Sequence, residues 1–350
     1  MGKETGFISE IGEFELIDRL KNILPGIDNS DVLVGIGDDT AVIKVNEEES
    51  WLVTCDIQIE DRHFRQKHTT FYQLGKRAMA VNLSDIAAMG GDPCFALVSL
   101  GLPPDLRLTN YDALFEGMRD QLAEYNANII GGNLAKSEEK LIIDITLIGK
   151  IKTKNVVQRK GANIGDQIFV TGVLGESGAG LALLEKFGDQ FPNKYQHLVD
   201  RHLAPRPQVA IGKQLASQNL VSAMIDLSDG LASDLNHICK MNQVGAHINF
   251  KALPFSRDVE EVSQICGVNL EHLVLHSGED YQLLFTVNKS VPISEIENIA
   301  KKEKVPVTAI GTIGPLSSGY ILTDLEGNMK NLNPQGWDHF KKSGNKSEVK

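Results

Sequence analysis

The sequence has 350 residues, which is long for one hydrophobic core, so we expect two domains. Hydrophobic residues make up 42% of the chain and charged residues 23%, as in ordinary globular proteins, and this argues against long disordered segments. The chain has 35 Lys and Arg against 46 Asp and Glu, a formal net charge of −11. This excess of negative charge disfavours binding to nucleic acid or to an anionic membrane.

The four cysteines are far apart and form no CxxC pair, which argues against a zinc site and against a disulfide framework. The N-terminal residues lack the apolar segment of a signal peptide, and no apolar run is long enough to span a membrane. These features predict a cytoplasmic protein with reduced thiols.

Hydrophobic periodicity predicts alternating helices and strands in the first half of the chain. Thr69 and Thr70 can cap one helix, and Gly90 with Gly91 can end it. In chain order we expect a helix around 14–20, strands at 32–34, 41–43 and 51–54, a helix at 71–89, a strand at 94–100, a helix at 110–125, a glycine turn at 131–133 and a strand at 141–148.

The chain becomes polar and basic around residues 150–165, where we place the domain boundary. Residues 1–150 would form the N-terminal domain and 151–340 the C-terminal domain, followed by a polar tail at 341–350. In the second half we expect strands at 167–171, 221–225, 246–250, 281–287 and 307–311, helices at 176–187, 209–218, 231–240, 259–266 and 293–302, and a hairpin near 326–328.

The glycine-rich turn at 172–180 lies between a predicted strand and a predicted helix, where a phosphate can bind. It lacks both the lysine of a P-loop and the glycine spacing of a dinucleotide-binding fold. The sequence therefore disfavours both of these nucleotide sites.

Two adjacent carboxylates follow a glycine turn in the segment Gly35–Thr40, at Asp38 and Asp39. Neighbouring carboxylates raise each other's pKa unless a cation compensates them. Mg²⁺ is such a cation, because it takes oxygen ligands and substrate phosphates together. The alternative is an Asp-rich turn with no ligand, since Gly and Asp are ordinary turn residues.

Further oxygen-bearing clusters lie where predicted elements begin or end, so they could converge on one cleft. The clusters contain Asp56, Asp85, Asp226 with Asp229, and Glu279. Helix capping would explain Ser228 and Asp229 but not Asp226. For Asp85 the alternative is a hydrogen bond to a neighbouring backbone or a salt bridge, and for His63 it is a structural or solvated side chain.

The motifs GIGDDTAV at 35–42, VNLSDIAAMGGDP at 81–93, IDLSDGL at 225–231, SGEDYQLLF at 277–285 and GWDHF at 336–340 together closely resemble the thiamine-monophosphate kinase family. The resemblance implies a two-domain α+β fold of the aminoimidazole-ribonucleotide-synthetase-like superfamily. The N-terminal sheet domain would bind ATP and metal and form a homodimer, and the C-terminal domain would be an α/β sandwich. It also implies Mg²⁺-dependent and ATP-dependent phosphorylation of thiamine monophosphate to thiamine diphosphate, the last step of its biosynthesis.

The resemblance also assigns roles to individual positions. It implies metal binding by Asp39, Thr54, Cys55, Asp56, Asp85, Asp226 and Asp229, ATP binding by Gly132, Asn133, Arg159 and Ser228, and substrate binding by His63, Glu279 and Trp337. Cys55 stands where a Thr is frequent and would bind through its backbone. Asn133 stands where many relatives have Asp, so it keeps an oxygen ligand without the charge.

The chemistry that the resemblance implies needs no covalent or general-base residue. The acceptor is a phosphate monoester with a second pKa of about 6, so its oxygen is already an anion at neutral pH. Several Mg²⁺ ions would neutralise the two anionic partners and align them for direct in-line transfer. Trp337 could stack on the cationic thiazolium ring of the substrate.

Two alternatives stay open at this point. The first is another ATP-using enzyme of the superfamily, such as a ring-closing amidine synthetase, a selenide enzyme or a hydrogenase-maturation enzyme. The chain has no glycine-rich tail with a reactive Cys, and its first cysteine is Cys55. The second is a catalytically silent protein that binds thiamine phosphates or nucleotide, and Asn133 is the feature that favours it.

Overall fold

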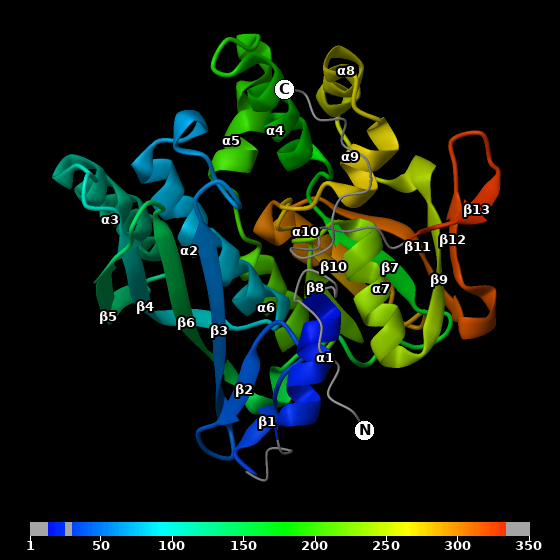
Figure 1. The fold of residues 1–350 in the computed structure, drawn as a ribbon. Helices are drawn as coiled ribbons and strands as arrows, with labels where there is room; N and C mark the ends of the chain where they lie inside the picture. The colour runs from blue at the N-terminus through cyan, green and yellow to red at the C-terminus, as the bar shows by residue number, and fades with distance from the viewer. Residues whose placement is uncertain (1–12, 25–29, 334–350) are drawn as a thin grey trace, which may run out of the picture.

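The computed structural model of the chain describes residues 13–24 and 30–333, and it contains two sheets with helices packed on them (Figure 1). The GWDHF motif with Trp337, and the tail after it, lie outside the described residues. Among the described residues, no helix is both long and apolar enough to cross a membrane.

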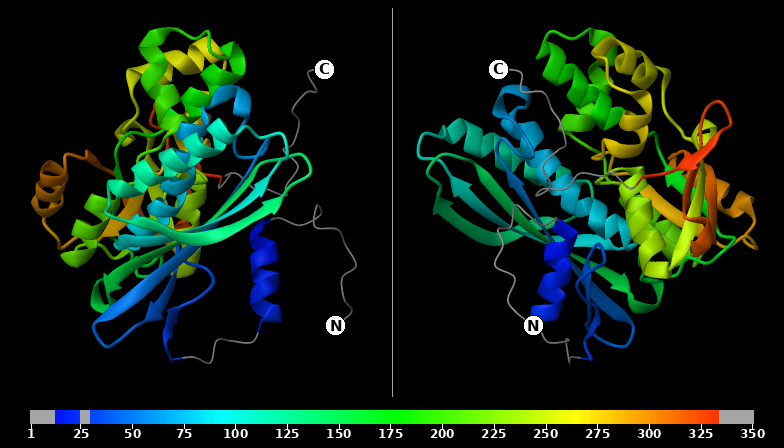
Figure 2. Two further views of the ribbon diagram at one scale, coloured as in Figure 1. Left: turned by 90° about the vertical axis from the view of Figure 1, so that its left-hand side faces the viewer. Right: turned by 45° about the vertical axis from the view of Figure 1, so that its right-hand side comes forward.

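The N-terminal sheet has six strands in the order β1-β2-β3-β6-β4-β5. Neighbouring strands are antiparallel except β4 and β5, which are parallel. Helices α2 and α3 lie against one face of this sheet (Figures 1 and 2). The elements are α1 (Glu13–Ile23), β1 (Val32–Val34), β2 (Ala41–Lys44), β3 (Glu49–Ile59), α2 (Phe71–Ala88), β4 (Asp92–Leu102), α3 (Leu108–Ala123), β5 (Asn128–Lys136) and β6 (Ile142–Lys152).

Helix α2 begins where the sequence predicts, because Thr70 and Gln73 form a capping box. Two glycines let α2 and α3 approach closely. A Cβ on Gly75 would lie 2.0 Å from the carbonyl oxygen of Leu114, and a Cβ on Gly117 would lie 2.0 Å from that of Tyr72. Side chains at these positions would force the helices apart, so the two glycines fix the place of α2 on the sheet.

The C-terminal sheet has seven strands in the order β13-β12-β9-β11-β7-β10-β8, and its pairs are antiparallel except β12 with β9. Helices α6 and α10 pack on one face, and α4, α5, α7, α8 and α9 belong to the core on the other face. The elements are β7 (Gln167–Thr171), α4 (Glu176–Phe187), α5 (Gln196–Leu203), α6 (Val209–Ser217), β8 (Ala223–Asp226), α7 (Leu231–Asn242), β9 (Val244–Asn249), α8 (Arg257–Cys266), α9 (Leu270–His276), β10 (Leu283–Val287), α10 (Ile293–Glu303), β11 (Val307–Pro315), β12 (Tyr320–Thr323) and β13 (Met329–Asn331).

Helix α2 lies between the two sheets and joins their cores (Figure 2). Its Leu83 and Ile86 belong to one buried cluster with Leu215 of α6 and Phe285 of β10. A Cβ on Gly212 of α6 would lie 2.3 Å from the carbonyl oxygen of Ala87. This close approach places the polar side chains of α2 at the junction of the domains.

The predicted α+β fold with two sheet domains is confirmed. The turn expected at 131–133 is wrong, because these residues lie inside strand β5. Gly132 has φ +151°, and a Cβ there would lie 1.8 Å from the carbonyl oxygen of Val98 on β4. Gly132 therefore lets β5 pair closely with β4 next to a register shift, and it does not form a turn. Helix α9 was not expected. The domain boundary at residue 150 stays a prediction.

Candidate functional site

Three predicted metal ligands come together at the domain junction. Asp39 lies between β1 and β2, Asp85 lies on α2, and Asp226 is the last residue of β8. Ligand oxygens of these three carboxylates lie within 4.8 Å of one another. We call them the carboxylate cluster, and it joins segments that are 187 residues apart, since 226 − 39 = 187.

Two hydroxyl groups donate to the carboxylate cluster. Thr54 Oγ1 donates to Asp85 Oδ2 at 2.5 Å, and Ser84 Oγ donates to Asp226 Oδ2 at 2.7 Å. Asp56 lies two residues after Thr54 on β3, so both side chains point to the α2 side of the sheet. The donor to Asp85 is a side chain on β3, and not the neighbouring backbone or the salt-bridge partner expected if Asp85 were structural.

The carboxylate cluster carries more negative charge than its surroundings compensate. Burial and the charge of Asp39 raise the pKa of Asp226 to about 8. Burial and the charges of Asp56 and Asp226 raise the pKa of Asp85 well above its ordinary value. Asp39 Oδ2 is buried and has no hydrogen-bond partner among the described residues. This oxygen-only donor set fits a hard cation such as Mg²⁺.

Arg159 is the cation that the structure places against this cluster. Its Nε and Nη2 donate to Asp39 Oδ1 at 3.2 Å and 2.5 Å. Its backbone N lies 3.3 Å from both carboxylate oxygens of Asp38, whose pKa burial and Asp39 raise to about 6. Burial opposes the charge on Arg159, but Asp39, Asp38 and Asp226 raise its pKa. Arg159 therefore stays charged and offsets part of the negative charge.

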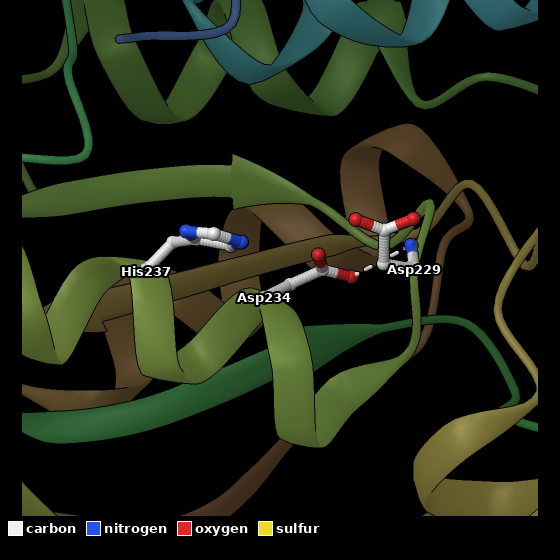
Figure 3. Close-up of side chains that lie close together, drawn as sticks. All are labelled: Asp229, Asp234 and His237. Atoms are coloured by element: carbon white, nitrogen blue, oxygen red, sulfur yellow. Dashed lines mark hydrogen bonds between the residues drawn. The ribbon is translucent and has the colours of Figure 1, made fainter. Parts of the chain in front are cut away.

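A second group of ligating side chains lies at the start of α7, formed by Asp229, Asp234 and His237 (Figure 3). Asp234 Oδ2 accepts from the backbone N of Asp229 at 3.2 Å and of Gly230 at 3.0 Å. The N-cap residue of this helix is Gly230, without a side-chain cap hydrogen bond, so the capping considered for Ser228 and Asp229 is wrong, and Asp234 instead holds the loop that precedes the helix. Burial and nearby cations lower the pKa of His237 to about 4, so its imidazole is neutral.

The predicted substrate residues His63 and Glu279 lie on either side of Arg77, a buried residue of α2. Arg77 forms an ion pair with Glu279, and its Nη2 lies 3.4 Å from the carbonyl oxygen of His63. Burial would raise the pKa of Glu279, but Arg77 and His202 lower it, so this carboxyl is ionised. The His63 ring is oriented by its Nδ1, which accepts from the Ile59 backbone at 2.9 Å.

Two predicted site residues, Cys55 and Asn133, have side chains on the other face of the N-terminal sheet. The Cys55 thiol contacts Asp144 Oδ1 at 3.1 Å, and burial with Asp144 raises its pKa, so the sulfur is no thiolate ligand. Gly132 and Asn133 are exposed on β5, and Asn133 is in register with Ser99, which is in register with Asp144. The side chains of Cys55 and Asn133 therefore point away from α2 and the carboxylate cluster, whereas Gly132 is in register with the buried Val98.

The sequence analysis missed several side chains of the site. Asp234 and His237 lie in a helix, where a single polar residue is usually solvated or structural. Arg77 follows Lys76 on α2, but unlike Lys76 it lies among the buried residues of the helix. A buried Arg needs an anionic partner. The position of Arg77 on the apolar face of a predicted helix could therefore have identified it as a buried residue with such a partner.

Comparison with known proteins assigns the class of both domains. The AIR synthase related protein N-terminal domain matches residues 37–151, and the AIR synthase related protein C-terminal domain matches residues 163–322. The protein is therefore built from two AIR synthase related domains.

Full-length relatives narrow this class. A thiamine-monophosphate kinase of Buchnera aphidicola subsp. Acyrthosiphon pisum is 36% identical and covers 94% of this chain and 98% of its own. A solved structure of AaThiL complexed with AMPPCP and TMP has a TM-score of 0.81 and 33% identity, covering 96% of this chain and 100% of the other. The chain belongs to the thiamine-monophosphate kinase family, as its motifs predict.

The fold is shared more widely than the family. Hydrogenase maturation protein HypE has a TM-score of 0.68 over 92% of this chain and 96% of the other, at 17% identity. This likeness shows the fold alone.

Proposed function

We propose that the protein transfers the γ-phosphoryl group of ATP to the phosphate of thiamine monophosphate and releases thiamine diphosphate and ADP. Family membership supports this activity. The observation that carries it in this chain is the carboxylate cluster of Asp39, Asp85 and Asp226, which gathers uncompensated negative charge at the domain junction. Such a cluster is costly unless a cation that also binds phosphates occupies it.

Mg²⁺ would be held by Asp39, Asp85 and Asp226, and bound there it supplies positive charge that offsets the repulsion between the two phosphate groups. Thr54 and Ser84 donate to two of these carboxylates and hold them in place. Arg159 fixes Asp39 from the other side. The further proposed metal ligands are Cys55 through its backbone, Asp56 and Asp229.

The residues of the chain bind and orient the reactants and take no covalent part. The acceptor oxygen is already an anion near neutral pH because the second pKa of a phosphate monoester is about 6. Alignment of two bound reactants in a site that excludes water is enough for in-line transfer. We expect no phosphoenzyme, and labelled phosphate trapped on the protein during turnover would contradict this.

The ligand contacts are proposals as well. Gly132, Asn133, Arg159 and Ser228 would contact ATP, and His63, Glu279 and Trp337 would contact thiamine monophosphate. Arg159 already faces the carboxylate cluster, where the phosphates of ATP would meet the metal. Asn133 offers an amide oxygen without charge. An amide binds metal less tightly than a carboxylate, so ATP binding at this position would depend less on a metal ion than it would if the residue were Asp.

The first experiment measures Mg²⁺-dependent ADP release by the purified protein, with and without thiamine monophosphate, and identifies the product by chromatography. We expect ADP release that depends on thiamine monophosphate and is matched by thiamine diphosphate. Binding of thiamine monophosphate without turnover would instead identify a silent binding protein. Chelation of Mg²⁺ should stop the reaction, and its return should restore it.

We also propose a homodimer formed through the open face of the N-terminal sheet, opposite α2 and α3. This face carries exposed apolar side chains, among them Trp51 at 40%, Ile57 at 48% and Leu97 at 37% exposure. A large apolar patch of this kind is typical of an interface. Sedimentation of the wild type should give a dimer, and Ile57→Asp should give a monomer.

The cytoplasmic location stays a prediction.

A further inference from the structure

Arg77 is a buried cation that connects three separate segments of the fold. Its side chain is 3% exposed. Nη1 donates to the carbonyl oxygen of His202 at 2.5 Å, Nη2 lies 3.4 Å from the carbonyl oxygen of His63, and Nη2 also pairs with Glu279 Oε1. Arg77 and His63 belong to the N-terminal sheet domain, whereas His202 and Glu279 belong to the C-terminal one. The four residues form what we call the Arg77 cluster.

The backbone fixes where Glu279 can point. Gly278 and Glu279 have φ +69° and +59°, and this left-handed conformation is unusual for Glu. A Cβ on Gly278 would lie 2.4 Å from the carbonyl oxygen of Ser228, and the Glu279 N donates to that same oxygen at 2.8 Å. The turn that carries Glu279 is therefore tied to the loop that precedes α7. Strain of this kind persists where the surroundings hold it in place.

His202 contributes a neutral neighbour. Its Nδ1 lies 3.5 Å from Glu279 Oε2 and 3.1 Å from Ser177 Oγ. Burial and the charge of Arg77 lower the pKa of His202 to about 4. At neutral pH the charge of Glu279 is thus balanced by Arg77, while 29% of its side chain stays exposed to a ligand.

We propose that Arg77 is a positioning residue for thiamine monophosphate, which acts by holding the Glu279 carboxylate in one geometry across the domain junction. This inference rests on the proposed function. A carboxylate repels a phosphate and attracts a cation or an N–H donor. In this proposal Glu279 contacts the cationic thiamine portion of the substrate. Arg77 influences the binding of that portion through Glu279 and does not contact ATP.

Because Arg77 contacts Glu279, replacing Arg77 should change the affinity for thiamine monophosphate and leave the affinity for ATP nearly unchanged. We would measure kcat and both KM values, and binding of thiamine monophosphate by calorimetry, for Arg77→Met and Arg77→Lys. Arg119→Met is the matched control, because Arg119 is 68% exposed and pairs with Asp120 on the surface of α3. For R77M we expect KM for thiamine monophosphate to rise about tenfold or more, with KM for ATP nearly unchanged. R77K should keep most of the affinity, because it keeps the charge beside Glu279.

A double variant separates positioning from simple damage to the fold. R77M leaves the Glu279 carboxylate uncompensated, so Arg77→Met combined with Glu279→Gln is compared with Glu279→Gln alone. If Arg77 acts through Glu279, both proteins have the same KM for thiamine monophosphate. A further tenfold rise in the double variant would overturn the proposal, and so would equal changes of both KM values in a correctly folded R77M.

The same experiment distinguishes this inference from the proposed function. If the wild type neither binds nor phosphorylates thiamine monophosphate, the proposed function fails and this inference fails with it. If the wild type binds the substrate and R77M binds it equally well, the role of Arg77 alone is wrong.

Discussion

Two buried groups of charge lie at the domain junction, and they differ in how their charge is balanced. The carboxylate cluster brings together Asp39, Asp85 and Asp226, with Arg159 contacting Asp39. The Arg77 cluster pairs one guanidinium with one carboxylate, and the neighbouring His202 is neutral. Both groups join segments from the two domains.

The difference between them indicates different roles. In the carboxylate cluster the pKa of Asp226 rises to about 8, so the free protein holds protons where a metal would otherwise balance the charge. In the Arg77 cluster the pKa of Glu279 falls, so the ion pair is complete without a ligand. The first group is arranged to receive cations, and the second is arranged to hold a geometry before the substrate arrives.

The largest loss of activity is expected for variants that remove a carboxylate of the carboxylate cluster. Asp85→Asn and Asp226→Asn each remove a proposed metal ligand, and kcat should fall about 100-fold to 1000-fold because charge stabilisation of the transferred group is lost. Asp92→Asn is a matched control, since Asp92 is 40% exposed and pairs with Lys213. Turnover by ADP release measures the effect, and near-normal rates in both cluster variants would show that the metals are placed wrongly.

The second prediction concerns stability without metal, where the two clusters should respond with opposite signs. Asp226→Asn removes one of several repelling carboxylates, so it should raise the free energy of unfolding. Arg77→Met leaves a partly buried carboxylate without its partner and should lower it by roughly 3 to 4 kcal/mol. Thermal melting in chelator measures both, and a change of the same sign in the two variants would contradict the distinction.

A pH dependence should arise from the Arg77 cluster. His202 has a pKa of about 4 when folded, below its ordinary 6.5, so between these values the unfolded state binds a proton that the folded state does not. The contribution of His202 to the free energy of unfolding should therefore fall as pH drops from 6.5 to 4, by up to about 3 kcal/mol, and the difference between wild type and a His202 variant isolates it. Denaturant titrations measure this, and His202→Asn should flatten the slope.

The smallest effect is expected for the hydroxyl that supports the carboxylate cluster. Thr54→Val keeps the shape of the side chain and removes the 2.5 Å hydrogen bond to Asp85, so kcat should fall about tenfold, or ~1.4 kcal/mol. Ser50→Ala is the control, because Ser50 lies on the same face of β3 and bonds to Thr153 instead. Equal losses in both variants would indicate general damage to the strand.

Local patterns in the sequence carried much of this structure. The spacing of apolar residues predicted α2, β7, α4 and α10 to within a few residues. The helices have a clear apolar face, and the strand is apolar along most of its length. Asp39, Asp85 and Asp226 stand out in the sequence as carboxylates beside glycine or near predicted element ends, and the family resemblance assigns them to the metal. These are features that a short window of sequence contains.

What escaped prediction depends on contacts between distant segments. Gly131 and Gly132 look like a turn, and only the closeness of Val98 on β4 explains why they lie in a strand. Arg77 looks like an ordinary helix residue until Glu279, 202 positions later, is folded against it. Asp234 looks solvated until the loop before α7 turns its N–H groups toward it.

The place of α2 in both buried cores has a consequence for how the protein unfolds. The helix packs on the N-terminal sheet and on α6 and β10, so neither domain keeps a complete core when the other is lost. Melting should then occur as a single cooperative transition, without a stage in which one domain stays native. A fragment that contains only the C-terminal sheet would expose the apolar surface of α6, and such surfaces make proteins aggregate.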